Sequence, residues 1–90
     1  MAWMGRASDL RKMRAIRRTL SEVPGVAAVR EIGLRRMDDS RRDDMTVVDA
    51  RIAIAKPLGT EAGHYIAIIA RQRVLQRHRV LNTLIDIDFR

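Results

Sequence analysis

One histidine and two aspartates carry side chains of the kind that build divalent-metal sites. His64 stands alone in its segment, whereas Asp86 and Asp88 are separated by a single residue. Imidazole nitrogen and carboxylate oxygen together bind zinc, manganese or iron, with water in the remaining positions. Zinc takes about four protein or water ligands, and Asp49 or His78 could contribute one from a neighbouring segment. These residues permit a metal site without requiring one.

Arg51 offers an alternative in which no metal is bound. Its guanidinium is permanently protonated and cannot be a ligand. If Arg51 shares a sheet face with Asp86 and Asp88, a charge-assisted bridge from Arg51 to one of them satisfies these carboxylates without a cation. In that arrangement, alanine at Arg51 is expected to create or improve metal binding rather than abolish it.

Length and composition limit the class of protein. The chain has 90 residues, enough for one domain, and its small size favours self-association. It has no cysteine, which excludes disulfides and thiolate metal sites. Its apolar runs fall short of the roughly 20 residues of a membrane span, and its start lacks the apolar core of a signal peptide. We expect a soluble, cytoplasmic protein with a tail over residues 1–7 and a domain over residues 8–90.

The first half of the chain predicts a helix followed by a strand. Apolar residues at spacings of three and four predict a helix over 9–23, with Ser8 as its cap and a Pro-Gly pair at its end. The next segment, 26–37, predicts a strand whose alternation is imperfect around Gly33, which indicates a bulge or an edge position there. The polar stretch 38–44 suits a connection between antiparallel strands.

The second half predicts a strand, a helix and a last strand. Residues 48–54 alternate between apolar and other side chains, which is typical of a half-buried strand. Thr60 can cap a helix that reaches about Arg77, whose apolar stripe is wider than one sheet face requires and so implies a second contact surface. His78 follows the helix and is expected on the surface. Residues 84–89 alternate again, with Phe89 directed toward the core.

This order of elements predicts an α+β fold. Two helices on one face of a three-stranded sheet form an open-faced α/β sandwich in α-β-β-α-β order, a ferredoxin-like arrangement lacking its first strand. Such a sheet leaves one face uncovered.

Taken in order, these segments resemble the cytoplasmic C-terminal domain of cation diffusion facilitator (cation efflux) transporters. The resemblance covers about Trp3 to Arg90 and rests on Val23-Pro24-Gly25-Val26, the strand 48–54, Ala62-Gly63-His64-Tyr65-Ile66-Ala67 and the terminal Leu84-Ile85-Asp86-Ile87-Asp88. It implies a homodimer beneath a membrane cation transporter. It also implies that the domain regulates divalent-cation transport and binds a metal, often zinc, at or near the dimer interface.

The resemblance further implies which positions are metal ligands. The helical histidine of the family falls on His64, its strand histidines fall on Arg51 and near Arg30, and its last-strand histidine and carboxylate fall on Asp86 and Asp88. Arginine therefore replaces two ligands, and the family's acidic residue before the first helix has no counterpart. The expected function is a dimerisation and regulatory domain with a depleted metal site, which binds zinc, manganese or iron through His64, Asp86 and Asp88, or binds none.

The basic composition supplies a second hypothesis from a different class. The net charge is +7, and Arg11, Arg14 and Arg18 share one row of the first predicted helix, opposite its apolar stripe. A solvated helix face is the ordinary interpretation of such a row. The alternative is an anion-binding adaptor without a metal site, whose row contacts anionic lipid head groups or nucleic acid.

Nucleic acid and catalysis both find little support in the sequence. No aromatic stacking platform and no helix-turn-helix pattern is present, so a nucleic-acid partner is disfavoured. The chain has no cysteine nucleophile, no serine beside a histidine and no glycine-rich phosphate loop. We therefore expect a protein that is not an enzyme.

Overall fold

The fold consists of two helices and three strands. A computed structural model of the chain describes residues 7–37 and 45–88. The elements are α1 (Ala7–Ser21), β1 (Val26–Arg36), β2 (Thr46–Ile54), α2 (Thr60–Arg77) and β3 (Asn82–Asp88). This order confirms the predicted α-β-β-α-β arrangement. The connection 38–44 and Phe89, whose positions the sequence also predicted, lie outside the described residues.

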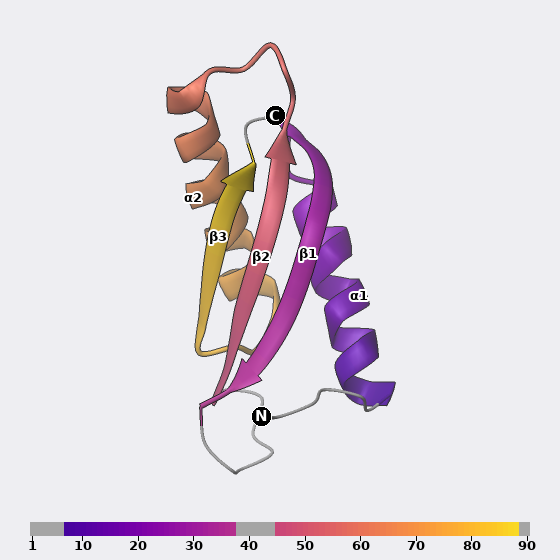
Figure 1. Cartoon of the computed structure of the whole chain (residues 1–90). Helices are drawn as coiled ribbons and strands as arrows, with labels where there is room; N and C mark the ends of the chain where they lie inside the picture. The colour runs from indigo at the N-terminus through magenta and orange to yellow at the C-terminus, as the bar shows by residue number, and fades with distance from the viewer. Residues whose placement is uncertain (1–6, 38–44, 89–90) are drawn as a thin grey trace.

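The three strands form one sheet in the order β1-β2-β3. Strand β1 is antiparallel to β2, whereas β3 is parallel to β2 and is reached through the crossover helix α2. Both helices lie on the same side of the sheet, α1 beside β1 and α2 beside β3 (Figure 1). One face of the sheet is therefore open, and β1 and β3 are both edge strands.

The core lies between the two helices and the covered face of the sheet. Inward side chains of the central strand β2 meet apolar residues of both helices in one cluster, whose fully buried members include Ile16, Leu20, Val48, Ile52, Ala70 and Val74. Burying each large aliphatic side chain contributes about 1.5–3 kcal/mol, so this cluster dominates the stability of the domain. The strict alternation of 48–54 predicted this face correctly.

The irregularity of β1 differs in position from the prediction. Gly33 pairs regularly with Asp49, and the register shifts occur earlier, between Val26 and Ala28 and between Val29 and Glu31. The apolar residues at positions 26, 29 and 32 are three apart, so strict alternation would send them to opposite faces. One extra residue in each interval keeps all of them on the helix side. The predicted edge location is confirmed.

The predicted helix caps are wrong at both N-termini. Helix α1 begins at Ala7, so Ser8 lies inside its first turn. Thr60 is the first residue of α2, and the residue that precedes it, Gly59, makes no side-chain cap. The N-terminal end of α1 is instead held by Asp9, which is buried and forms an ion pair of 2.9 Å with Arg36 at the end of β1.

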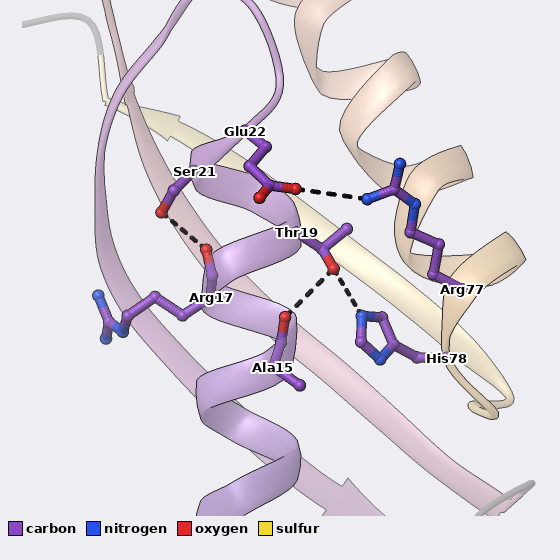
Figure 2. A network of polar contacts seen from close by, with 7 residues as sticks. All are labelled: Ala15, Arg17, Thr19, Ser21, Glu22, Arg77 and His78. Atoms are coloured by element: carbon purple, nitrogen blue, oxygen red, sulfur yellow. Dashed lines mark hydrogen bonds and ion pairs between the residues drawn. The ribbon is translucent and has the colours of Figure 1, made fainter.

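The two helices are joined by polar contacts near their C-terminal ends (Figure 2). The Oγ1 atom of Thr19 lies 2.8 Å from Nε2 of His78, and the Arg77 guanidinium lies 3.4 Å from the Glu22 carboxylate. His78 is half-buried rather than on the surface as predicted, because α1 covers it. Burial lowers the pKa of His78 below 6.5, and the positive charges of Lys12 and Arg77 lower it further.

Candidate metal site at the edge of the sheet

Strand β3 places its two aspartates on the open face of the sheet. Ile85 and Ile87 pack toward the core cluster, so the alternation of the strand turns Asp86 and Asp88 to the opposite side. Asp86 is the direct cross-strand partner of Arg51 on β2. The predicted sharing of one face by these aspartates and Arg51 is therefore present.

Arg51 forms a different ion pair from the one predicted. Its Nη1 atom lies 3.9 Å from the Oε1 atom of Glu31, the residue opposite it on β1. The prediction of a bridge to Asp86 or Asp88 is wrong, because Arg51 has acidic cross-strand neighbours on both sides and its guanidinium extends toward β1. Sequence reasoning missed Glu31 because the extra residues in β1 set the register that brings it opposite Arg51.

Arg30 pairs with the second aspartate of β3. Its Nε atom lies 3.8 Å from the Asp88 carboxylate, although β2 separates the two strands. Between them lies Ala53, the register partner of both Ala28 and Asp88. A side chain of this size leaves room for the arginine to reach across the sheet. Arg30 thus neutralises Asp88, one of the three predicted ligands.

His64 lies in the first turns of α2 and is exposed to solvent. It lines an open groove between α2 and the outer edge of β3, whose other lining residues are Ala67, Ile68, Ile85, Asp86 and Ile87. Within the described part of the chain, neither His64 nor Asp86 has a hydrogen bond or an ion pair. The structure therefore places two of the predicted ligands on one groove, and neither is paired with another described residue.

The full three-ligand set is not assembled within one chain. Among residues 7–37 and 45–88, no three His, Asp or Glu side chains are grouped closely enough to hold a metal ion. The two residues that could have contributed a further ligand have other partners. The Oδ2 atom of Asp49 lies 2.7 Å from Nε of Arg35, and His78 contacts Thr19. The described residues of one chain therefore supply an incomplete donor set.

An exposed apolar surface adjoins the groove. Tyr65, Ile68 and Ile69 on α2 are 69%, 54% and 39% exposed, and Leu84 on the open face of β3 is 48% exposed. Ile68 belongs both to this surface and to the lining of the groove. The wide apolar stripe of the second helix agrees with these exposed side chains, and a contact made through them stays a prediction.

The remaining predicted residues lie on α1. Arg11, Arg14 and Arg18 are exposed along the helix, as the sequence indicated. They are remote in the fold from the groove, which lies on α2 and β3 at the other edge of the sheet (Figure 1). No helix in the described residues combines the length and apolar character needed to cross a membrane.

Comparison with known proteins identifies the family. The family model for the cytoplasmic domain of cation efflux proteins matches residues 9–89, which is most of the chain. The chain belongs to this family. The assignment confirms the resemblance noted in the sequence, including the cytoplasmic location that the family description gives. No curated protein sequence matches the chain significantly.

Solved structures agree with the fold of the cation efflux domain. A double variant of the MamM C-terminal domain is 17% identical, with 94% of this chain and 98% of that chain covered and a TM-score of 0.82. The nickel form of another variant is 18% identical over 90% of this chain and 98% of that chain, at a TM-score of 0.78. A cadmium form is 19% identical over 93% of this chain and 99% of that chain, at a TM-score of 0.81. At these identities the likeness establishes the fold.

Proposed function

We propose that this chain is a non-enzymatic, homodimerising regulatory domain of a cation efflux system. In this proposal, two copies bind a divalent cation between them through His64 and Asp86 of each copy. The observation that carries the proposal is the shared groove, which His64 and Asp86 both line without a hydrogen bond or an ion pair to another described residue. The family assignment to a cytoplasmic domain of cation efflux proteins supports the regulatory role.

The donor count supports a site made by two copies. One chain offers one nitrogen ligand and one oxygen ligand in the groove, whereas zinc takes about four ligands. Two copies supply four protein ligands of the two types that suit zinc, manganese or iron. Asp88 is less available, because Arg30 neutralises it. The nickel and cadmium forms of the MamM domain support divalent-metal binding on this fold.

The apolar surface supports self-association at the same place. A helix that is apolar on its outer as well as its inner side is usually covered on both. On α2 the inner side faces the core through Ile66, Ala70 and Val74, and the outer side presents Tyr65 and Ile68 to solvent. Because Ile68 also lines the groove, a second copy seated on this surface would bring its own groove close to the first.

A cation held between two copies gives the domain its regulatory character. A ligand that binds only the associated form shifts the equilibrium toward that form by mass action. The cation concentration would thereby set the fraction of paired domains, which a membrane cation transporter would sense as a change in the spacing of its cytoplasmic parts.

Zinc titration of the purified domain tests this proposal. Sedimentation velocity and isothermal titration calorimetry should show a zinc-strengthened dimer with about one zinc ion bound for each pair of chains. His64→Ala and Asp86→Asn should each weaken zinc binding by about tenfold or more. Asp49→Asn is the matched control, since it removes the same charge from the same sheet face and should leave binding unchanged.

Two results would overturn the proposal. One is equal loss of zinc affinity in Asp49→Asn and Asp86→Asn, which would mean that only the overall charge of the face matters. The other is tight zinc binding by a variant that is monomeric, because a single chain would then supply the site.

A further inference from the structure

The outer side of α1 carries a row of cations that no described residue neutralises. We call Arg11, Arg14 and Arg18 the basic row. At 100° for each residue, the three lie within a narrow sector of the helix directly opposite Ile16 and Leu20, which are fully buried. The row therefore points away from the sheet, and it extends about 10 Å along the helix axis.

The other charged residues of α1 are engaged within the domain. Lys12 Nζ donates to the Arg79 carbonyl at 2.7 Å, and Arg17 donates to the Val29 carbonyl at 2.7 Å. The acid within the described part of α1, Asp9, is 4% exposed and pairs with Arg36. The basic row makes no hydrogen bond or ion pair with any described residue. Within the described part of the chain, no acidic side chain offsets the positive charge of the basic row.

We propose that the basic row binds the anionic head groups of a phospholipid membrane. A guanidinium forms paired hydrogen bonds with phosphate and remains charged at any physiological pH. Basic side chains beside an anionic leaflet attract it within about one Debye length, close to 10 Å at moderate salt. This surface lies on α1 and makes no use of the groove, so the inference goes beyond the proposed function and does not depend on it.

The family and the surface chemistry favour a membrane over nucleic acid. A cytoplasmic domain of a cation efflux protein works close to a membrane. Within the described residues, the aromatic side chain is Tyr65, which lies on α2 rather than beside the basic row. Among the residues that the structure describes, the row therefore has no stacking platform of the kind with which proteins hold single-stranded nucleic acid. Its chemistry fits phosphate groups presented on a surface.

Vesicle co-sedimentation of the full chain tests the inference. Vesicles of phosphatidylcholine with added phosphatidylserine should retain the domain, whereas vesicles of phosphatidylcholine alone should not. The triple variant Arg11→Gln, Arg14→Gln, Arg18→Gln should bind the anionic vesicles more weakly, by about fivefold for each arginine removed. Raising the salt concentration should weaken binding of the unchanged chain and close the gap between it and the variant.

A second triple variant provides the matched control. Lys56→Gln, Arg71→Gln, Arg79→Gln removes the same charge from exposed positions outside α1 and should retain vesicle binding. Circular dichroism of both variants checks that each is folded. Equal loss of binding to anionic vesicles in the two triple variants would overturn the inference. Equal binding of the unchanged chain to neutral and anionic vesicles would do the same. So would tighter binding of the unchanged chain to an oligonucleotide than to anionic vesicles, with the same dependence on the basic row.

Discussion

Arg51 and Asp86 are direct cross-strand partners on the open face of the sheet, and both side chains line one pocket. The ion pair of Arg51 is nevertheless with Glu31, on the other side of β2. Asp86 is left beside a positive charge without being bonded to it. This arrangement leaves the carboxylate without an ion pair among the described residues, and the nearby guanidinium opposes the binding of a metal cation.

Alanine at Arg51 should strengthen zinc binding. The substitution removes a positive charge from the pocket that Asp86 lines, so the repulsion of an incoming cation falls. We expect an increase in zinc affinity of about fivefold, since the charges are exposed and water screens them. Competition with a fluorescent zinc indicator measures the change. Arg35→Ala, on the same face but paired with Asp49, should have little effect; reduced affinity in Arg51→Ala would contradict the arrangement.

Acid should destabilise the domain through His78. Burial, with Lys12 and Arg77 nearby, lowers the pKa of His78 in the folded state below its unfolded value of 6.5. The unfolded chain therefore binds more protons, so stability is fully present above pH 6.5 and is lost as the pH falls through the folded-state pKa. Between about pH 7 and about pH 5, urea unfolding of His78→Gln should show a smaller loss of unfolding free energy than the unchanged chain shows. His64→Gln should lose as much unfolding free energy as the unchanged chain. The same dependence of unfolding free energy on pH in all three proteins would exclude His78 as its source.

Breaking the pair between Asp9 and Arg36 should cost much of the stability. The Nη2 and Oδ1 atoms are 2.9 Å apart, and the side chains are only 13% and 6% exposed. Asp9→Asn leaves a buried guanidinium without a counter-charge, which destabilises by about 3 kcal/mol. Chemical denaturation measures this difference. Asp49→Asn breaks an exposed pair with Arg35 and should lower the free energy of unfolding by less than about 1 kcal/mol. Comparable losses of stability in the two variants would contradict a larger contribution from the buried pair.

A charge on the outer side of α2 should disrupt the dimer. Ile68 is 54% exposed and lines the groove, so Ile68→Asp places a carboxylate in the proposed interface. We expect the dimer to dissociate at concentrations about tenfold higher than for the unchanged chain. Multi-angle light scattering over a dilution series detects the shift. Leu81→Asp, at a residue that is 49% exposed outside this surface, is the control, and an equal effect would place the interface elsewhere.

The sequence predicted what depends on periodicity and missed what depends on register. The alternation from Val48 to Ile54 fixes the central strand, its buried face and the position of Arg51 on the opposite face. The pairing of Arg51 with Glu31 depends on extra residues in β1, whose signal is the spacing of three between Val26, Val29 and Ile32. The sequence thus contains the signal for the bulges, whereas the prediction places the irregularity at Gly33.

The helix ends and His78 show a different limit. Capping residues such as Ser8 and Thr60 mark a helix start only to within a residue or two, because neighbouring residues can take the same role. The burial of His78 follows from the packing of α1 against α2, which no local pattern encodes. The presence of His64 and Asp86 on one groove likewise needs the crossover from α2 to β3, which sequence similarity suggested and periodicity alone did not.

Thermal unfolding with and without zinc, together with light scattering, tests most directly whether two copies of the domain bind a cation between them. A metal at about 100 times its dissociation constant should add about 2.7 kcal/mol to the stability of the dimer. We expect the melting temperature to rise with zinc, and we expect His64→Ala to remove the rise while remaining folded. A dimer whose melting temperature is unchanged by zinc, manganese or iron would contradict this expectation.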